Sequence, residues 1–420
     1  MKDIIVQKFG GTSVADTEKM KNVARIILKE RSSGNSVVVI VSAMGHTTDH
    51  LLKLASEVNN APSLRELDML LSTGECVSAS LLAMAIQAEG VKAVSLNAAQ
   101  AQIFTEKNHG SARILDIKPD NILNHLNNDE VVIITGFQGV AGDNEITTLG
   151  RGGSDTSAVA VAAAVGAKRC DIYTDVEGVY TTDPRVVPNA SKLDEISYEE
   201  MLELARVGAN VMHPRSVETA KQFKVPLRVR SSFKTDNLGT LILGVKDMEI
   251  RRTVTGVAAD LSQIRVVVCD VPDVPGNAGK LFETLASEGI SVDMIIQSYA
   301  RKHTNTNDIA FTIDKNVLKK TQSVIEAIKG ELGYNNIHID DQIAKVSIVG
   351  AGMIDRPGIA AMMFKTLADN DINIKMISTS EIIISCLVDA EHAQKAVKAL
   401  HSAFELESDI VAEVKGTLPD

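Results

Sequence analysis

The stretch IIVQKFGGTSV, residues 4–14, decides the fold of the first part of the chain. Its β-branched residues Ile4 to Val6 predict a buried strand, and Lys8 falls where that strand ends. Two adjacent glycines then let the backbone turn and approach a ligand closely. An amphipathic run from Thr17 to Arg31 predicts a helix. A strand, a glycine turn and a helix start form a geometry that binds anions, and because the lysine precedes the glycines this is not a Walker A loop.

Further β-branched runs alternate with helical patterns up to about residue 245. They are VVVIVSA (37–43), VVIIT (131–135), CDIYT (170–174) and PLRVR (226–230). Such alternation predicts an α/β domain, in which helices cover the faces of a sheet. The segment ends with GTLILG (239–244), and the charged stretch after it is expected to be a linker.

The composition argues against several classes of function. The chain has 420 residues and a formal net charge of −11, and only 3% of its residues are aromatic. Nucleic acid is not expected as a partner, because phosphate contacts need clustered Lys and Arg and stacking needs aromatic rings. No apolar run reaches the ~18 residues of a membrane span and no signal peptide opens the chain, so a cytoplasmic protein without a membrane partner is expected. The four cysteines are widely spaced, which favours reduced thiols over a disulfide framework or a zinc site: Cys76, Cys170, Cys269 and Cys386.

An internal repeat occupies the last third of the chain. DVPGNAGKLFETLASEGISVDMIIQS (273–298) and DRPGIAAMMFKTLADNDINIKMISTS (355–380) align at one offset of 82 positions. Each copy predicts the order strand, helix, strand, strand, helix, strand of a ferredoxin-like (βαββαβ) module. The predicted organisation is a first α/β domain over 1–245, a linker over 246–262, and two modules over 263–342 and 343–420.

Two further glycine loops carry polar side chains suited to anions. In LGRGGSD (149–155), Arg151 and two glycines precede a helix rich in small residues, so a guanidinium and a helix N-terminus suit a carboxylate or phosphate. Asp155 has two roles open to it, capping this helix or orienting a cation such as Lys8. In TDVEGVYTTDPR (174–185), a strand end and a glycine turn lead into an irregular segment, which either holds an adenine and ribose or is an ordinary turn-rich loop.

Taken in order, these loops resemble those of the aspartate kinases. The motifs that carry the resemblance are KFGGTSV (8–14), VSAMG with TTD (41–49), TGE (73–75), TGFQG (135–139), TLGRGGSD (148–155), TDVEGVYTTDPR (174–185) and HPRSVE (213–218). The C-terminal repeat resembles the paired ACT modules of that family, so the resemblance covers essentially the whole chain. It implies an α/β fold, in which a three-layer amino-acid-kinase domain precedes two ferredoxin-like ACT modules. It also implies transfer of the ATP γ-phosphoryl group to L-aspartate, giving 4-phospho-L-aspartate for lysine, threonine and methionine biosynthesis.

The resemblance implies a role for each residue that matches a family motif. Lys8 and Asp155 are the implied catalytic residues, with Lys8 neutralising charge on the transferred phosphoryl group. The residues implied to bind ATP are Lys8, Phe9, Gly10, Gly11, Ser42, Ser154, Thr174, Asp175, Tyr180, Arg185 and Asn210. Those implied to bind L-aspartate are Thr48, Glu75, Gly136, Phe137, Arg151, Gly152 and Gly153. Arg151 is expected to grip a carboxylate and Glu75 to pair with the α-ammonium group, while Mg²⁺ is held mainly by phosphates and water, with no protein metal site.

The expected chemistry needs no general base. The nucleophile is the β-carboxylate of the substrate, which is ionised at neutral pH because its reference pKa is about 3.9. His46 and His213 have no partners at ligand spacing and are expected to be structural. One departure from the family pattern is Asn210, because members commonly carry a lysine there. Either another cation such as Lys234 compensates, or ATP binds more weakly.

The ACT pair implies allosteric control by lysine, threonine or both. An effector carboxylate is expected at a strand-to-helix turn, where backbone amides meet a helix N-terminus. The residues expected to bind the effector are Asp273, Gly276, Ala278, Asp293, Gln297, Ile359, Ala360, Asn373, Ile374 and Ser380. ACT modules usually pair edge to edge across subunits, so at least a homodimer is expected. Two alternatives remain: a different kinase of the superfamily, such as N-acetylglutamate or glutamate 5-kinase, and a catalytically silent amino-acid sensor.

Overall fold

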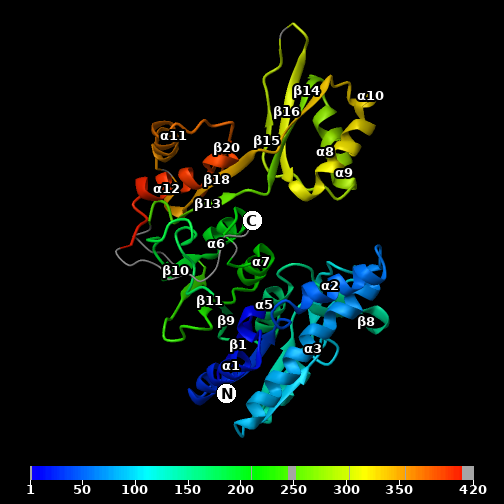
Figure 1. Cartoon of the computed structure of the whole chain (residues 1–420), viewed down its shortest axis with the longest axis vertical. Coiled ribbons are helices and arrows are strands. Elements are labelled where there is room, and N and C mark those ends of the chain that lie inside the picture. Colours follow the sequence, from blue (N-terminus) through cyan, green and yellow to red (C-terminus); the bar gives the residue numbers. More distant parts are fainter. Residues whose placement is uncertain (1, 210, 245–251, 302, 355, 409–420) are drawn as a thin grey trace. The chain divides into compact units, whose positions relative to one another are not determined.

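The computed structural model describes residues 2–209, 211–244, 252–301, 303–354 and 356–408. The chain divides into two compact units, and the boundary between them falls near residue 250. In Figure 1 the first unit is coloured from blue to green and the second from green to red. Helices and strands alternate along both, as the sequence predicts.

An eight-stranded sheet forms the centre of the first unit. In the order of the sheet, its strands are β10 (Glu195–Ser197), β12 (Thr240–Leu243), β11 (Leu227–Ser231), β9 (Arg169–Thr174), β1 (Ile4–Phe9), β2 (Ser36–Val41), β6 (Val131–Thr135) and β3 (Ala93–Leu96). The strands from β11 to β3 are all parallel, whereas β12 runs antiparallel to β11. Each β-branched run quoted above forms one of the parallel strands, which is the pattern of a sheet buried on both faces.

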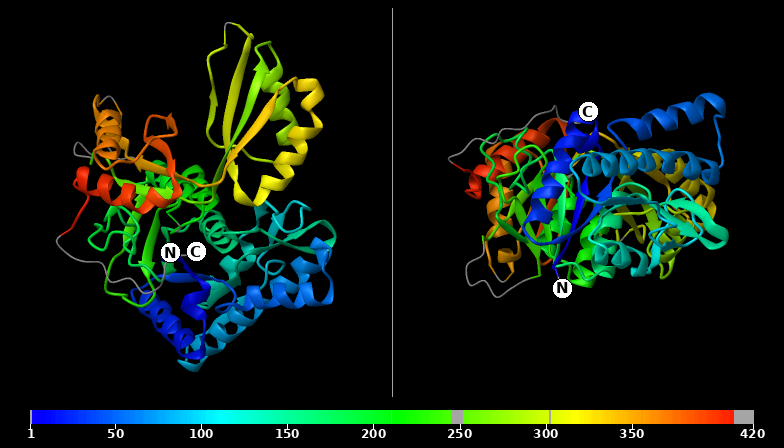
Figure 2. Two further views of the ribbon diagram at one scale, coloured as in Figure 1. Left: turned by 45° about the horizontal axis from the view of Figure 1, so that its top comes forward. Right: turned by 90° about the horizontal axis from the view of Figure 1, so that it is seen from below.

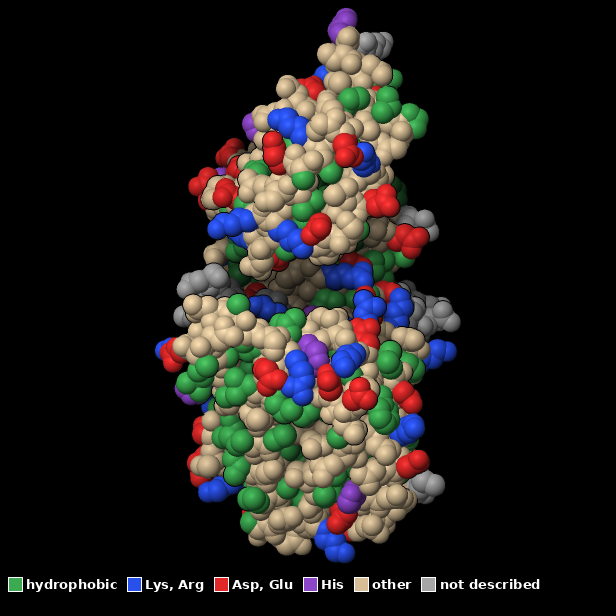
Figure 3. Space-filling model, turned by 90° about the vertical axis from the view of Figure 1, so that its right-hand side faces the viewer, with side chains coloured by type: hydrophobic (Ala, Val, Ile, Leu, Met, Phe, Trp, Pro, Cys, Tyr) green, Lys and Arg blue, Asp and Glu red, His purple; other side chains and the backbone are tan. Residues whose placement is uncertain are grey.

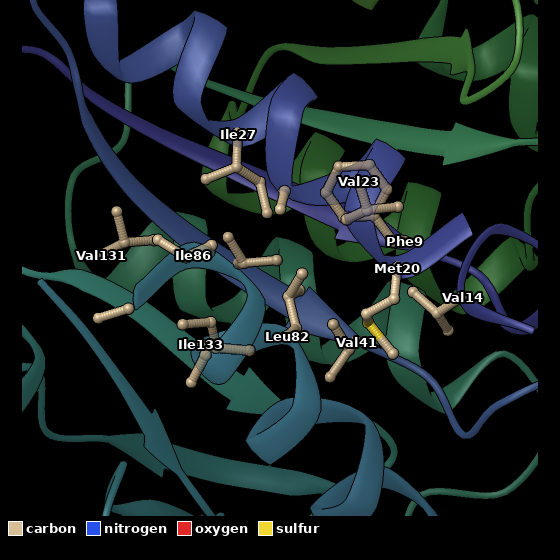
Figure 4. Close-up of a cluster of buried hydrophobic side chains, with 14 of the residues drawn as sticks. Phe9, Val14, Met20, Val23, Ile27, Val41, Leu82, Ile86, Val131 and Ile133 are labelled. Atoms are coloured by element: carbon tan, nitrogen blue, oxygen red, sulfur yellow. The ribbon is translucent and has the colours of Figure 1, made fainter. Parts of the chain in front are cut away.

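Helices cover both faces of this sheet. On one face, α1 (Thr17–Ser32) and α3 (Leu64–Ala88) bury Ile27, Leu82 and Ile86 against Val41 and Ile133 (Figure 4). On the other face, α5 (Gly153–Ala164) packs against β1, β2 and β9. The side chains of β2 alternate between these two layers because successive residues of a strand point to opposite faces. The predicted three-layer α/β architecture is therefore confirmed.

The rest of the first unit surrounds the loops at the ends of the parallel strands. A four-stranded sheet contains, in order, β5 (Ile114–Ile117), β4 (Ile103–Thr105), β7 (Gln138–Ala141) and β8 (Glu145–Thr148). The other helices are α2 (Thr47–Val58), α4 (Asp120–Asn127), α6 (Tyr198–Arg206) and α7 (Pro214–Phe223), with a 3₁₀ turn, η1 (Gly11–Val14), after β1. Proline is the first residue of α7, where its missing N–H leaves no hydrogen bond unmade.

Helix α3 is long and apolar enough to cross a membrane by length and composition alone. Half of the 18-residue apolar stretch that meets this criterion is buried inside the first unit, and core helices of soluble proteins meet the criterion too. Its buried positions follow the helical period, among them Leu71, Glu75, Leu82 and Ile86. The apolar character of α3 is therefore explained in part by its place in the core.

The second unit contains two four-stranded sheets. The first module has the sheet order β15 (Ile295–Gln297), β16 (Thr306–Asp314), β14 (Gln263–Pro272) and β17 (Asn336–Asp340), with helices α8 (Asn277–Ser287), α9 (Leu318–Ala327) and α10 (Lys329–Leu332) on one face (Figure 2). The second has the order β19 (Met376–Thr379), β20 (Ile383–Asp389), β18 (Ile343–Val349) and β13 (Gly256–Asp260), with α11 (Ile359–Asp369) and α12 (Ala393–Ala403). The turns before α8 and α11 repeat closely, since Gly276 and Gly358 both have φ +102°.

The second module corrects the predicted boundaries. Its fourth strand is β13, which lies within the predicted linker over 246–262 and pairs antiparallel with β18. In the part of the chain that the structure describes, no strand follows α12, so the βαββαβ order in one continuous segment holds only for the first module. The pairing of β13 depends on a strand more than 80 positions later, which a local pattern does not reveal. Residues 246–251 of the predicted linker lie outside the described residues.

The two modules are joined by a small core and by ion pairs. Met294 of the first module packs with Ile343, Met376 and Leu387 around the second sheet. The buried ammonium of Lys345 on β18 is paired with Asp293 of the first module. Lys375 Nζ lies 2.9 Å from Asp340 Oδ2 and makes a second link between the modules.

Candidate active site

The candidate site lies where the parallel strands of the main sheet end. Phe9 of β1 stands in register with Val41 of β2 and Tyr173 of β9, and Val41 stands in register with Thr135 of β6. The loops that follow these strands therefore meet at the carboxyl edge of one sheet, which is the usual ligand position in an open α/β fold. These loops carry the glycine motifs that the sequence singled out.

Lys8 and Asp155 form the central ion pair of this edge. Lys8 Nζ lies 2.6 Å from Asp155 Oδ1, and both side chains are mostly buried. Asp155 sits in the first turn of α5, whose N-cap, Gly152, makes no side-chain hydrogen bond. Of the two roles left open for Asp155, orienting the Lys8 ammonium is therefore the one that the contacts support. The ammonium is held at the positive end of a helix, where anions bind.

The glycines of KFGGTSV serve close packing. A Cβ atom added to Gly11 would lie 2.8 Å from the carbonyl oxygen of Ala43, so only glycine fits. The Gly10 N–H donates to the carbonyl oxygen of Tyr173 at 3.3 Å. Gly10 is implied to bind ATP, and its amide is already used by a carbonyl group at the end of β9. Ser42 is fixed in the same way, since its N–H donates to the carbonyl oxygen of Phe9 at 3.1 Å.

Glu75 is a buried carboxylate with one oxygen uncommitted. Its side chain lies on α3 and is 3% exposed. The Ala43 N–H donates to Oε1 at 3.1 Å, whereas Oε2 has no hydrogen-bond partner within the described ranges. Burial raises the pKa of Glu75 to about 7, only partly offset by hydrogen bonds from backbone amides. An unpaired buried carboxylate of this kind suits a cationic ligand group.

The loop that carries Arg151 is shaped by its glycines. Gly152 has φ +68°, and a Cβ atom there would lie 2.2 Å from Cβ of His213. A Cβ atom on Gly153 would lie 2.9 Å from the ring of Phe137, which itself has φ +69°. Arg151 is exposed at the tip of this loop.

The other residues expected at the substrate lie close by in the fold. Gly136 follows β6, and a Cβ atom on it would lie 2.8 Å from Ser154 Oγ. Thr48 is half-buried in the first turn of α2, which begins just after the loop that Glu75 contacts. The structure thus draws these positions to the same edge as the ion pair.

The residues expected to bind the nucleotide follow β9. Thr174 Oγ1 donates to Asp175 Oδ1 at 2.9 Å, and Tyr180 is mostly buried. Burial raises the pKa of Tyr180. The guanidinium of Arg185 is held by Asp183, with Nη2 2.7 Å from Oδ2.

Asn210 lies outside the described residues, so the departure from the family pattern cannot be placed. Lys234, the cation suggested as its substitute, has Nζ 2.7 Å from Glu177 Oε1. This hydrogen bond holds the pKa of Glu177 below its usual value. Lys234 is thereby fixed beside the loop over 174–185, where the nucleotide residues lie.

Two residues to which sequence reasoning assigned no role, Asp68 and Arg215, brace the Arg151 loop together with His213, which was expected to be structural. Buried Asp68 accepts hydrogen bonds from the Thr148 hydroxyl at 2.6 Å and from the Thr148 N–H at 3.0 Å. Arg215 donates from Nη1 to the carbonyl oxygen of Leu149 at 3.1 Å, and His213 packs on Gly152. The available signals were an acidic residue, Asp68, just before the apolar run of α3, and the arginine of the HPRSVE motif.

The predicted effector residues are only partly brought together. Asp273, Gly276, Ala278 and Gln297 line a pocket of about 440 Å³ in the first module. Asp273 Oδ1 accepts a hydrogen bond from Asn307 Nδ2 at 2.9 Å, and Asn307 lines the same pocket.

The remaining expected effector residues lie elsewhere. Asp293 is paired with Lys345 between the modules. Ile359 and Ala360 begin α11, while Asn373, Ile374 and Ser380 flank β19. None of these six residues lines the pocket described above.

The protein families that this chain matches correspond to its two units. Residues 3–231 match the amino acid kinase family, and residues 264–328 and 346–404 match an ACT domain. The fold and site thus define an amino acid kinase with C-terminal ACT modules. An aspartokinase from Geobacillus stearothermophilus is 50% identical over 409 residues, which are 97% of this chain and 99% of the relative.

Solved structures agree with the sequence relatives. Aspartokinase III from E. coli in complex with aspartate and ADP (R-state) is 28% identical, with a TM-score of 0.82 over 96% of this chain and 99% of that one. The same enzyme in complex with lysine and aspartate (T-state) covers the same shares at 28% identity, with a TM-score of 0.73. The chain belongs to the aspartokinase family, and it is an ATP-dependent kinase that acts on aspartate. The alternatives of a different superfamily kinase and of a silent sensor are set aside by this membership.

Proposed function

We propose that the chain transfers the γ-phosphoryl group of ATP to the β-carboxylate of L-aspartate, as the first step towards lysine, threonine and methionine. A carboxylate oxygen of the substrate bonds to the γ-phosphorus, the bond to the β–γ bridging oxygen breaks, and 4-phospho-L-aspartate and ADP result. The observation that carries this proposal is the Lys8–Asp155 pair, 2.6 Å apart, at the sheet edge where the glycine loops meet.

Lys8 supplies positive charge to the transferred group. Phosphoryl transfer is catalysed mainly by positioning and by stabilising charge on the phosphoryl oxygens. Because Asp155 fixes the ammonium and burial excludes much of the water, that charge is oriented before the substrates arrive. The N-terminus of α5 adds a partial positive charge from the same side.

Glu75 and Arg151 select the amino-acid acceptor. Oε2 of Glu75 receives the α-ammonium group of L-aspartate, which removes the cost of an unpaired buried carboxylate. Arg151 binds a carboxylate by paired hydrogen bonds, on a loop that His213 and Arg215 hold in place. Thr48 and the backbone at Gly136, Phe137 and Gly153 complete the acceptor site.

The nucleotide lies along the loops after β1 and β9. Ser154 contacts the phosphates, and Thr174, Asp175, Tyr180 and Arg185 line the nucleoside. Mg²⁺ bound with ATP would neutralise phosphate charge. Its ligands would be mainly phosphate oxygens and water, as is usual for Mg²⁺ bound with a nucleotide.

The second unit provides feedback control by lysine, threonine or both. The pocket at Asp273 and Gln297 offers a carboxylate for an ammonium group, beside the N-terminus of α8 for a carboxylate. The E. coli relative crystallised in complex with lysine supports an amino-acid effector. Edge strands β15 and β19 expose Ile295 and Ile377, which supports pairing of ACT modules across a homodimer.

Product trapping tests the proposed reaction. The full chain is incubated with ATP, Mg²⁺ and hydroxylamine, which converts an acyl phosphate into a stable hydroxamate. We expect ADP and aspartyl hydroxamate in equal amounts with L-aspartate, and neither with L-glutamate or N-acetyl-L-glutamate. ADP release without hydroxamate, or a preference for either glutamate compound, would overturn the proposal.

A further inference from the structure

Three buried polar residues lie along one side of α3. Asp68 is 1% exposed, and Ser72 and Glu75 are each 3% exposed. Their spacing of four and then three positions places them on the same face of the helix, one turn after another. In the proposed function, Glu75 receives the α-ammonium group of L-aspartate. Asp68 and Ser72 are therefore in line with a residue of the acceptor site.

Asp68 holds the end of β8 that leads to Arg151. Its carboxylate accepts hydrogen bonds from the Thr148 hydroxyl at 2.6 Å, from the Thr148 N–H at 3.0 Å and from the Gly110 N–H at 3.0 Å. Thr148 is the last residue of β8, and Arg151 follows three positions later. Hydrogen bonds to an ionised carboxylate are stronger than those between neutral groups. Asp68 therefore fixes the base of the Arg151 loop on α3.

His109 connects the other end of the same strand to Asp68. Its Nδ1 lies 2.9 Å from Asp68 Oδ2, and its Nε2 lies 3.2 Å from Oε2 of Glu145, the first residue of β8. Arg65 Nε and Lys107 Nζ lie 3.8 Å and 3.4 Å from Glu145 Oε1. Figure 3, which presents the side of the molecule that carries α2 and β8, shows basic, acidic and histidine side chains close together on the first unit. Strand β8 is thus attached to α3 at both ends.

Ser72 attaches the neighbouring strand β7 to the same face of α3. The side-chain amide of Gln138, which is 2% exposed, donates from Nε2 to the carbonyl oxygen of Ser72 at 3.0 Å. Gln138 is the first residue of β7 and follows Phe137, one of the residues proposed for the acceptor site. Strands β7 and β8 pair antiparallel, with Gln138 opposite Thr148. Both segments that lead to the acceptor therefore start from one face of α3.

We propose that Asp68 is a positioning residue that sets the distance between Glu75 and Arg151 and thereby selects L-aspartate over longer acidic amino acids. This inference rests on the proposed function, in which Glu75 binds the α-ammonium group and Arg151 binds a carboxylate. L-Glutamate carries the same groups and one more methylene group, so it fits only if the two ends of the site move apart. The anchors on α3 oppose that movement. One methylene group changes kcat/KM by roughly 10- to 200-fold in enzyme sites.

Two adjacent threonines of β8 provide a matched test. Thr148→Val removes the hydroxyl that donates to Asp68, whereas Thr147→Val removes a buried hydroxyl that lies 2.6 Å from the hydroxyl of Thr105 on the other face of the strand. The full chain is assayed with ATP, Mg²⁺ and hydroxylamine, and with L-aspartate or L-glutamate. We expect Thr148→Val to lower kcat/KM for L-aspartate about tenfold, to form glutamyl hydroxamate and to keep the wild-type KM for ATP. Thr147→Val should match the wild type in all three measurements.

The outcomes separate this inference from the proposed function. If the wild type forms no aspartyl hydroxamate, the proposed function fails. If the wild type forms it but Thr148→Val yields no glutamyl hydroxamate, or Thr147→Val shows the same change as Thr148→Val, only the role of Asp68 is overturned.

Asp68→Asn is the stronger variant, because its amide places an NH₂ group against the donors that the carboxylate accepts from. We expect a larger loss of kcat/KM for L-aspartate than in Thr148→Val, with the same gain of glutamyl hydroxamate. Its melting temperature is measured beside its kinetics. A lower melting temperature with unchanged kinetics for both amino acids would show that Asp68 only stabilises the fold, and would contradict the proposal.

Discussion

The edge of the main sheet and the effector region of the second unit bring their residues together by different means. At the sheet edge, Lys8 and Asp155 are distant in sequence yet 2.6 Å apart, because the parallel strands fix where each loop ends. In the second unit, Asp273 and Gln297 share a pocket, but Asp293 is held between the modules by Lys345. The candidate active site lies at the ends of strands in one sheet, and the sequence motifs therefore reveal it. The effector site lies beside two packed modules, so its residues also depend on how those modules contact each other.

The largest effect is expected at the catalytic edge. Lys8→Ala should lower kcat about 10²- to 10³-fold, because it removes a preorganised charge from the transition state, with a smaller change in the KM for L-aspartate. Steady-state kinetics of the purified variant measures this loss. Lys21→Ala is the control, since Lys21 is exposed and paired with Glu18 in its own helix. Near wild-type turnover in Lys8→Ala would contradict the assignment of the sheet edge as the active site.

The next effect concerns the shape of the Arg151 loop. Gly152→Ala should lower kcat/KM for L-aspartate about 10²-fold, because the new Cβ would meet His213 and a shift of about 1 Å at a reacting group costs that much. Gly34→Ala is a matched control, as Gly34 also has positive φ but has open space around it. Kinetics in Gly152→Ala as close to wild type as those of Gly34→Ala would contradict the argument that packing on His213 shapes the loop.

A smaller effect should follow the ionisation of Glu75. Its pKa of about 7 means that the unliganded enzyme carries the protonated acid at lower pH, so kcat/KM for L-aspartate should fall about tenfold per pH unit below pH 7. Glu75→Gln should have a low kcat/KM for L-aspartate that does not change with pH in this range. A pH profile of both enzymes measures it, and the same slope in Glu75→Gln would assign the titration to another group.

The same pKa shift sets the sign of a stability change. Between the ordinary value of 4.5 and about 7 the folded state binds more protons than the unfolded state, so stability should fall as pH rises through that window. Glu75→Gln should remove this loss and be more stable than the wild type at pH 8 without ligand. Thermal unfolding at pH 5 and pH 8 compares them. A Gln variant that is less stable at pH 8 would contradict the burial argument.

The smallest effects should separate the two acids of the second unit. Asp273→Ala should weaken effector binding about tenfold through loss of a charge-assisted hydrogen bond, with little change in the melting temperature. Asp293→Ala should instead destabilise the unit by roughly 1 to 2 kcal/mol, because Lys345 is buried but Asp293 is half exposed. Calorimetric titration of lysine and threonine, separately and mixed, into both variants tests this. Effector binding lost only in Asp293→Ala would move the site to the module interface.

Local sequence patterns predicted much of the fold but fewer of the residues that form the candidate site. The β-branched runs predicted the parallel strands, and the 82-residue repeat predicted two modules. The strand β13 was missed because its pairing with β18 is set by tertiary contact alone. The braces at Asp68 and Arg215 were missed for the same reason, since a buried acid and a distant arginine gain meaning only once the Arg151 loop lies beside them.

The central claim is that Lys8 and Asp155 act as one unit on the transferred phosphoryl group. A double-mutant cycle on kcat with Lys8→Ala, Asp155→Asn and the combined variant tests it most directly. If Asp155 acts by holding the Lys8 ammonium, the combined variant should be no slower than Lys8→Ala alone. Losses that multiply in the combined variant would show that the two residues act independently, and would contradict the account.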